Sequence, residues 1–311
     1  MTDLRFSVTQ DELSQASRGD QRLRDFLAEL ADRRIPVELF VTVNAMSYVE
    51  HDVSKAESFG LDVRTVHLPP LVRGAEDDGD VELNTHLKES QMVYEHDDDG
   101  NVERVRNLAP ELTTVHPPRF PAAESADLEA RRERLVRTLA ASRDHRRAER
   151  RYRGPVALEN VCPRGPFDYL LTTPEDVTAL RATADRLGRR DALAFTCDLG
   201  HARDPFELLD AVESPASVHL HGTLPASATD ELGSVCETFG VESSDALAVE
   251  ESVGEYHHLP PTVGAPSLGR VADALDARDI DCPVVVELRS AFETAEAVAR
   301  ISDAVREGGA C

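Results

Sequence analysis

The sequence predicts an α/β fold, a single-domain (β/α)8 barrel that spans residues 1–311. Eight short apolar segments recur along the chain, and most of them precede a segment with helical periodicity. A carboxylate or an imidazole stands at the end of most of these strands, which suits the carboxyl-terminal face where barrel enzymes build their sites. A doubly wound open sheet is the second choice, but no G-x-G-x-x-G motif follows an early strand.

Each predicted strand is a short apolar run, often β-branched, that a polar or turn-forming residue ends. In order, the strands are expected at residues 4–9, 36–43, 63–68, 112–115, 155–158, 194–198, 217–220 and 283–286. The third strand is halted by Pro69-Pro70. The sixth delivers Asp198 and then turns through Gly200 to His201.

Each predicted helix carries apolar residues at helical spacing. The clearest start is at Thr173, an N-cap residue with Pro174 at the first helical position and acidic residues in the first turn. Gly60 is a good stop for the second helix. The helices are expected at residues 11–34, 45–59, 125–151, 173–189, 205–212, 267–278 and 291–306.

Two segments break the alternation of strands and helices. Residues 71–110 form an insertion after the third strand, in which 91–96 and 101–105 flank an acidic turn and predict a β-hairpin. Residues 223–266 are acidic and contain repeated glycines and prolines, so we expect a long irregular loop after the seventh strand.

The composition is strongly acidic, with 58 acidic against 34 basic side chains. A net charge of −24 with an ordinary apolar fraction is typical of a folded protein from a halophilic cytoplasm, where salt screens the repulsion. Such a surface disfavours nucleic acid as a partner in dilute salt. High salt weakens that argument.

The five cysteines are widely spaced and odd in number, without a C-x-x-C motif, which predicts reduced thiols. The amino-terminal segment is polar, and no apolar run approaches about 18 residues. We therefore expect a soluble cytoplasmic protein without a signal peptide or a membrane partner. Whether it forms a homo-oligomer is left open.

The candidate site consists of residues at strand ends. In chain order these are His67, His116, Glu159, Asp198 with His201, His219 with His221, and Glu287. Carboxylates and imidazoles that converge on one barrel mouth predict a divalent metal site for Zn²⁺, Mn²⁺, Co²⁺ or Mg²⁺. Taken singly, a strand-end histidine is more often a hydrogen-bonded polar group than a ligand.

Four arginines follow strand ends and could bind an anionic group: Arg119, Arg164, Arg203 and Arg289. Arg289 is preferred, because it follows Glu287 by two residues and so leaves the strand on the same side. Glu287 could instead simply pair with Arg289. No glycine-rich phosphate loop is evident, so the sequence does not say whether the substrate is phosphorylated.

Several segments together resemble the xylose-isomerase-like barrel superfamily, which contains sugar and sugar-phosphate isomerases and epimerases as well as endonuclease IV. The matching segments are Val37-Glu38-Leu39-Phe40, Val156-Ala157-Leu158-Glu159-Asn160, Cys197-Asp198-Leu199-Gly200-His201-Ala202, Val218-His219-Leu220-His221-Gly222, His258-Leu259-Pro260-Pro261 with Gly264, and Val286-Glu287. The resemblance covers residues 36–289, and the E-N and D-x-G-H-A segments are its most specific parts.

This resemblance implies a metal-dependent isomerase or epimerase that acts on a small sugar. By motif position, the metal ligands are Glu159, Asp198, His219 and Glu287. Glu159 and Glu287 are also the implied catalytic acid and base, which move a proton through an enediolate. The remaining candidates are implied to bind substrate: His67, His116, His201, His221, His258 and Arg289.

Two departures from the family pattern keep other functions open. Gly222 stands where the seventh-strand motif has an acidic residue, and Tyr256 stands where many members have an aspartate. Endonuclease IV, with a cluster of about three zinc ions, is the main alternative, because the candidate histidines supply most of its ligand positions. A barrel that has lost catalysis and only binds a metal or ligand is the third possibility.

Overall fold

The computed structural model describes most of the chain. The described residues are 3–41, 49–68, 92–96, 102–107, 110–121, 127–149, 154–162, 167–241 and 254–308. The acidic turn of the predicted hairpin, Asp97–Gly100, and one arginine candidate, Arg164, lie outside them. The side chain of Arg119 lies outside the described part as well.

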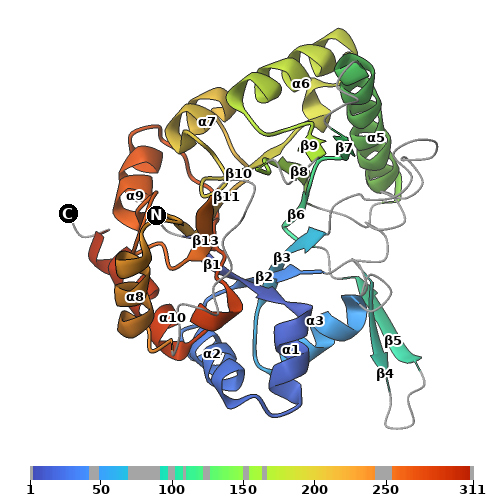
Figure 1. Ribbon diagram of the computed structural model, residues 1–311. Helices are drawn as coiled ribbons and strands as arrows, with labels where there is room; N and C mark the ends of the chain where they lie inside the picture. The colour runs from blue at the N-terminus through green and yellow to red at the C-terminus, as the bar shows by residue number, and fades with distance from the viewer. Residues whose placement is uncertain are drawn as a thin grey trace.

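Eight parallel strands close into a barrel, which confirms the predicted fold class (Figure 1). The strands follow one another around the barrel in chain order, and β1 closes the ring against β14. The barrel strands are β1 (Leu4–Thr9), β2 (Val37–Phe40), β3 (Val63–Leu68), β6 (Leu112–Val115), β8 (Val156–Glu159), β10 (Phe195–Asp198), β11 (Ser217–Leu220) and β14 (Val284–Val286).

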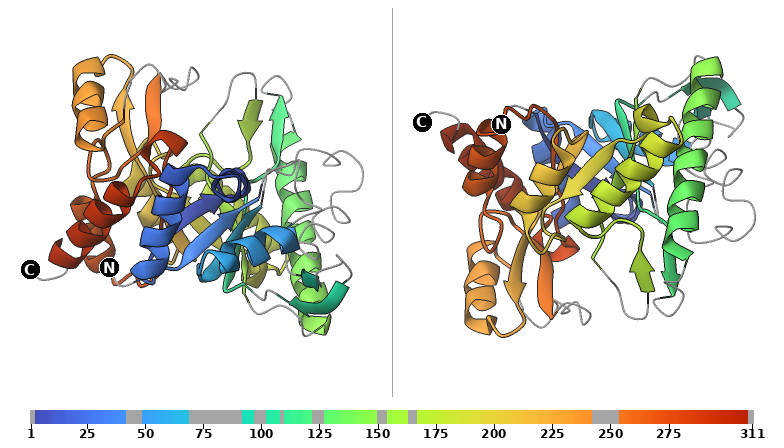
Figure 2. Two further views of the ribbon diagram at one scale, coloured as in Figure 1. Left: turned by 90° about the horizontal axis from the view of Figure 1, so that it is seen from below. Right: turned by 90° about the horizontal axis from the view of Figure 1, so that it is seen from above.

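Helices surround the barrel, as Figures 1 and 2 show from three directions. They are α1 (Gln10–Ser17), α2 (Gln21–Asp32), α3 (Val49–Ser58), α5 (Leu128–Glu149), α6 (Pro174–Arg186), α7 (Pro205–Val212), α8 (Thr229–Thr238), α9 (Leu268–Asp276) and α10 (Ala295–Gly308). Short 3-10 turns lie at Arg190–Ala192 and Ser290–Phe292. Apolar residues at helical spacing form the buried faces; in α2 these are Leu23, Phe26, Leu27 and Leu30.

The first predicted helix is in fact two helices. The chain leaves α1 through Gly19, whose φ of 110° is open to glycine but strained for other residues. Asp20 then caps α2, and its side chain accepts a hydrogen bond from the N–H of Leu23 at 3.1 Å. The apolar residues over 11–34 keep helical spacing, but Gly19 and Asp20 end one helix and begin the next within this range.

The segment after β11 is more regular than predicted. It contains β12 (Gly222–Pro225), helix α8 and β13 (Glu255–Leu259), and the two strands pair antiparallel. Helix α8 begins after Ala228, which offers no capping side chain, so the sequence lacks a start signal there. The predicted irregular loop is therefore wrong over these residues.

Two further strand pairs lie outside the barrel. In the insertion after β3, strand β4 (Met92–His96) pairs antiparallel with β5 (Val102–Asn107), as the sequence predicts. Strand β7 (Arg119–Pro121) pairs antiparallel with β9 (Phe167–Tyr169). No helix in the described part of the chain is long and apolar enough to span a membrane. Among the described cysteines, Cys197, Cys236 and Cys282 are free thiols.

In several barrel strands, such as β8, β10 and β11, successive side chains point alternately into the barrel and toward the helices. In β10, Thr196 and Asp198 lie on one face, and Cys197 lies on the other. Two residues before His116, Asp198 and His219, the side chains of Thr114, Thr196 and Ser217 form a layer of hydroxyl groups inside the barrel. Thr114 Oγ1 lies 3.2 Å from Thr196 Oγ1, which lies 2.9 Å from Ser217 Oγ. The next inward position on each of these strands belongs to the candidate site.

Candidate metal centre

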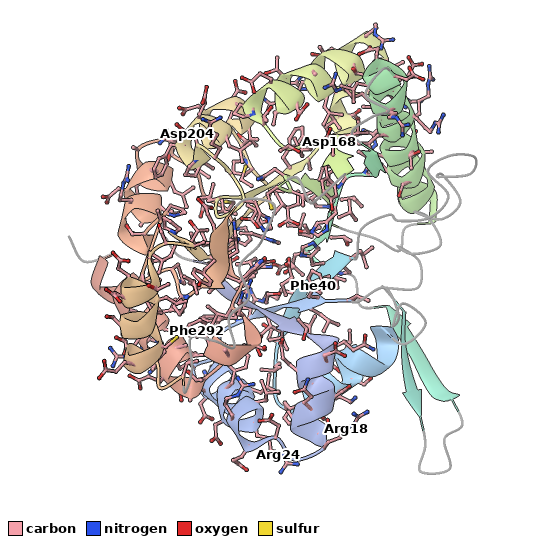
Figure 3. The ribbon with its side chains drawn as sticks, in the orientation of Figure 1. Arg18, Arg24, Phe40, Asp168, Asp204 and Phe292 are labelled. Carbon is pink, nitrogen blue, oxygen red and sulfur yellow. The ribbon has the colours of Figure 1, made fainter. Side chains whose placement is uncertain are left out.

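The candidate site occupies the carboxyl-terminal mouth of the barrel, as the sequence predicts. His67 lies on β3, His116 directly follows β6, Glu159 and Asp198 end β8 and β10, His219 lies on β11, and Glu287 directly follows β14. Phe40, labelled in Figure 3, ends β2 and packs against His67 with its ring at 4.6 Å. The structure thus brings residues from six strands into one buried cluster.

Both carboxylate oxygens of Glu159 face histidines. Its Oε2 lies 3.0 Å from His67 Nε2 and 2.8 Å from His116 Nε2. Its Oε1 lies 2.8 Å from His219 Nδ1. The Glu159 side chain is only 1% exposed. Glu159 therefore stands between two groups of imidazoles, and neither oxygen faces open space.

Glu38 and Glu287 approach His219 from two sides. Glu38 Oε1 lies 3.2 Å from His219 Nε2 and 3.5 Å from His67 Nδ1. Glu287 Oε1 lies 3.0 Å from His219 Nδ1, and its Oε2 lies 3.6 Å from His258 Nδ1. Both ring nitrogens of His219 consequently face carboxylates.

Asp198 connects this cluster to a second group of histidines. Its Oδ1 accepts hydrogen bonds from the N–H groups of Gly200 at 2.8 Å and His201 at 2.9 Å. Its Oδ2 lies 2.8 Å from His201 Nδ1. Asn160 fixes the end of β10, because its side-chain amide donates to the Asp198 carbonyl and accepts from the Asp198 N–H, each at 2.8 Å.

His221 and His258 pack closely beside Asp198. The N–H of His258 donates to His221 Nδ1 at 3.1 Å, so a neutral His221 ring carries its proton on Nε2, which lies 3.4 Å from Asp198 Oδ1. His258 has a φ of 58°, in the left-handed region that residues other than glycine rarely adopt. Gly200 makes room for this arrangement, since a Cβ there would lie 2.1 Å from His221 Cε1.

The histidines set the ionisation of the buried carboxylates. Burial would raise the pKa of Glu159, but the charges of His67, His219 and His116 outweigh it and hold that pKa well below its usual range. Burial acts in the same way on Asp198, where His201 and His221 lower the pKa. Burial would also raise the pKa of Glu38, but the nearby His219 lowers it to about 2. The pKa of Glu287 is also lowered, by His219, despite its burial.

The histidine pKa values divide by position. For His67 and His219, burial lowers the pKa, but the facing carboxylates raise it well above the ordinary value. For His116 and His258, burial dominates and the pKa is lowered. Those two are also the more open rings, with side chains 14% and 24% exposed. The deep rings therefore favour the charged form and the outer rings the neutral form.

The donors fit divalent metal ions. Ligand atoms within 4.8 Å of one another form overlapping sets, namely His67, His116 and Glu159; Glu159, Asp198, His219 and Glu287; Glu38, His67, His219 and Glu287; and His201, His221 and His258. Many of these atoms lie at ion-pair distances yet make no well-aligned hydrogen bond with a described residue, including both oxygens of Glu159 and both ring nitrogens of His67 and His219. Lone pairs that converge without hydrogen-bond geometry suit a shared cation.

Two residues in this cluster were not assigned from the sequence. Glu38 lies inside β2 and not at its end, where the other candidates stand. The sequence signal for it is an isolated carboxylate within an apolar strand. His257 lies beside His258 on β13, 5.6 Å from the His201 ring. Arg289, predicted to bind an anion, donates from Nε to the His257 carbonyl at 3.0 Å and thereby supports that strand.

The two departures from the family motif have structural explanations. A Cβ at Gly222 would lie 2.2 Å from the Val263 carbonyl oxygen, so the close backbone approach excludes any side chain. Tyr256 is buried in the hydrophobic core, opposite Leu224 in the β12–β13 pair. His257 and His258 follow Tyr256 on β13, and they bring imidazoles to this end of the barrel.

Comparison with known proteins identifies the fold. No family model and no curated protein matches the sequence. Among solved structures, a Thermus thermophilus protein studied after soaking with zinc chloride is 17% identical, with a TM-score of 0.56 over 98% of this chain and 99% of that one. A family 2 AP endonuclease from Brucella melitensis is 14% identical, with a TM-score of 0.54 over 96% and 97%.

A sugar phosphate isomerase/epimerase from Parabacteroides distasonis is similar to the same degree. It is 13% identical, with a TM-score of 0.54 over 96% of this chain and 93% of that chain. At these identities the likeness establishes the fold and not the reaction. The chain therefore shares its (β/α)8 barrel fold with these proteins.

Proposed function

We propose that the barrel mouth binds two divalent metal ions and that the protein is a metal-dependent hydrolase of a small phosphate ester. The observation that carries this proposal is the position of Glu159, whose two oxygens face different groups of ligands. His67 and His116 would complete one metal position with Glu159. Asp198, His219 and Glu287 would complete the second with the same carboxylate.

The donor chemistry supports zinc or another ion that prefers nitrogen. Each position combines imidazole and carboxylate donors, which suit Zn²⁺, Mn²⁺ and Co²⁺ better than an all-oxygen site suits Mg²⁺. Paired ions in such a site supply Lewis acidity to both the attacking and the leaving oxygen of a phosphate ester. Glu38 would act from behind the ligands, where its contact with His219 fixes the orientation of that ring.

His258 and His201 would face the substrate. The lowered pKa of His258 keeps its imidazole neutral beside Glu287, so the ring can accept or donate one hydrogen bond at the open edge of the site. His201 is held by Asp198 and borders the adjacent pocket. The strongly negative surface opposes a nucleic-acid duplex, which supports a small substrate over DNA.

Isomerisation or epimerisation of a sugar is the second candidate. It is favoured by the complete set of Glu159, Asp198, His219 and Glu287, the four ligands that the sequence resemblance implies for one metal. Glu287 could serve as a base, because its Oε2 faces the more open His258 side. Glu159 is less suited to remove a proton from carbon, since histidines face both of its oxygens.

Metal analysis and two activity assays separate these functions. The proposal predicts about two ions per chain and hydrolysis of bis(p-nitrophenyl) phosphate or p-nitrophenyl phosphate in high salt. His116→Gln should remove about one ion and most of the hydrolysis. One ion per chain together with deuterium exchange into a sugar from D₂O would instead establish the isomerase. Incision of an oligonucleotide at an abasic site would show that the substrate is DNA after all.

A further inference from the structure

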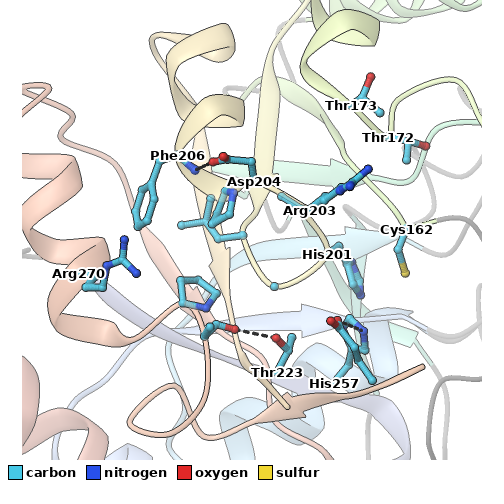
Figure 4. A pocket seen from close by; sticks show the side chains of 17 residues that line it. Cys162, Thr172, Thr173, His201, Arg203, Asp204, Phe206, Thr223, His257 and Arg270 are labelled. Atoms are coloured by element: carbon cyan, nitrogen blue, oxygen red, sulfur yellow. Dashed lines mark hydrogen bonds and ion pairs between the residues drawn. The ribbon is translucent and has the colours of Figure 1, made fainter. Parts of the chain in front are cut away.

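A pocket of about 720 Å³ lies beside His201 and His257 (Figure 4). His201 and His257 line the side nearest the metal ligands, and the pocket extends to Thr172, Arg203 and Arg270. Its volume is in the range of roughly 300–1,000 Å³ that accommodates small molecules. The pocket is therefore large enough for the part of a substrate that does not react.

Two carboxylates line this pocket, and the groups nearest to them in the described structure are not its arginines. Asp204 caps α7, and its Oδ1 accepts hydrogen bonds from the N–H groups of Phe206 at 3.2 Å and Glu207 at 3.0 Å. Glu255 Oε2 lies 3.5 Å from His257 Nε2. Neither carboxylate is therefore committed to an arginine of the pocket.

Arg203 differs from most of the arginines whose side chains the structure describes. Arginines such as Arg132, Arg143 and Arg278 form ion pairs with carboxylates. Within the part of the chain that the structure describes, Arg203 makes no ion pair or hydrogen bond, although it lines the pocket two residues after His201. In Figure 4 its side chain lies above His201 on the side of Thr172.

Arg270 occupies the opposite end of the pocket. Its guanidinium stacks over the Phe206 ring at 5.1 Å, which gives that cation an aromatic partner. Arg203 has no such partner among the described residues. The two arginines thus carry the same charge in one pocket but differ in distance from His201 and in what they contact (Figure 4).

We propose that Arg203, together with the Thr172 hydroxyl, forms an anion subsite that holds a carboxylate or phosphate group of the substrate. This anionic group of the substrate is a different group from the phosphate ester that reacts at the metal ligands. That distinction rests on the proposed function. The planar guanidinium offers a fork of N–H donors to two oxygens of either anion. A local site of this kind is needed because the negative surface repels anions over longer distances.

The test measures binding of inorganic phosphate and of acetate by calorimetry in molar salt, where long-range screening leaves mainly short-range contacts. The protein is used as purified, and its metal content is measured in the same samples. We expect Arg203→Gln to weaken binding of the preferred anion about 10-fold or more, and Thr172→Val to weaken it less. The preferred anion identifies the substituent as a phosphate or a carboxylate.

Two variants that lose the same charge serve as controls. The first is Arg270→Gln, at a residue that lines the pocket. The second is Arg18→Gln, at the end of α1, far from Asp204 and the pocket (Figure 3). Both should bind the anion as the wild type does. Equal weakening by Arg203→Gln and Arg270→Gln would overturn the subsite, as would unchanged binding by Arg203→Gln or no measurable binding of either anion to the wild type.

The metal measurement separates failure of the subsite from failure of the proposed function. Normal metal content with unchanged anion binding in Arg203→Gln refutes only the subsite. Absence of bound metal, with anion binding still lost in Arg203→Gln, refutes the metal-dependent hydrolase and leaves the anion site established. Thermal melting of each variant confirms that a loss of binding does not reflect unfolding.

Discussion

Two groups of buried carboxylates in this protein have opposite ionisation. The carboxylates at the barrel mouth are surrounded by histidines, which hold the pKa values of Glu159 and Asp198 well below the usual range. Glu293 is equally buried but faces Glu12, and burial together with the Glu12 charge raises the pKa of Glu293 to about 11. Burial is common to both groups, so the neighbours decide the charge.

This contrast separates a structural carboxyl pair from a cation site. Glu293 keeps its proton and is neutral, so this buried carboxyl needs no counter-ion. The mouth gathers several ionised carboxylates, and only protonated imidazoles or bound cations can balance them. Ionised carboxylates with converging imidazoles are therefore the more informative pattern for function.

Glu159→Gln should have the largest effect, because this side chain would be shared by both metal positions. Metal affinity should fall by at least about 100-fold, more than the loss of an outer hydrogen-bonding partner costs. Metal content after dialysis measures the change. Glu237→Gln, an exposed change of the same chemistry on α8, should retain the wild-type content; retention by Glu159→Gln would exclude a ligand role.

Metal removal should lower stability at the mouth. Zinc at about 100 times its dissociation constant should raise the free energy of unfolding by about 2.7 kcal/mol relative to chelator-treated protein. Thermal melts with and without zinc chloride test this. His67→Ala should abolish most of the gain, whereas His258→Ala should keep it, because His258 belongs to neither proposed metal position. An identical Tm with and without zinc in the wild type would contradict the proposed centre.

Gly200→Ala tests the close approach of the His221 ring to the backbone at Gly200. The new Cβ would lie 2.1 Å from the His221 ring, so the ring must move, at a cost of about 1–3 kcal/mol in unfolding free energy. Gly269→Ala is the matched control, because nothing lies within 4 Å of a Cβ there and alanine suits helix α9 better. Urea unfolding of both variants gives the comparison, and equal stability would mean that His221 is not fixed.

Glu293→Gln should change only the pH dependence of stability. The folded pKa of about 11 exceeds the unfolded value near 4.5, so the protonated carboxyl stabilises the fold fully below the unfolded pKa. That contribution is lost as pH rises from there toward 11. The variant has no proton to lose, so its stability relative to the wild type should increase by about 1.4 kcal/mol per pH unit at most.

Unfolding in urea at pH 5, 7 and 9 measures this slope. Metal content should remain unchanged at each pH, since Glu293 lies outside the ligand sets. A relative stability that is constant with pH would mean that Glu293 is ionised like the carboxylates of the mouth.

The sequence was sufficient for the barrel and for most of the candidate ligands, because the end of a parallel strand is marked by both composition and position. Glu159, Asp198 and Glu287 each close an apolar run, and the structure brings them together. Glu38 belongs to one of the matching segments, but its role could not be predicted because it lies inside β2 and not at the strand end. The β12–β13 pair and α8 escaped because Gly222 and Ala228 carry no local signal for them.

The roles of individual histidines depended on contacts that spacing does not reveal. His221 was predicted to bind substrate, but its Nδ1 accepts the N–H of His258 and its ring is buried. Gly222 looked like the loss of an acidic residue, whereas the Val263 carbonyl leaves no room for one. Both facts depend on residues about 40 positions apart in the chain.

The hydroxyl groups below the candidate ligands can change the direction of their hydrogen bonds. Thr114, Thr196 and Ser217 form a chain in which each oxygen can donate or accept. A hydrogen-bond chain of this kind can reverse its polarity by rotating three hydroxyl hydrogens, with no heavy atom displaced. The barrel can therefore present either sign of dipole to the charge above it, whether the mouth holds imidazolium rings or metal ions.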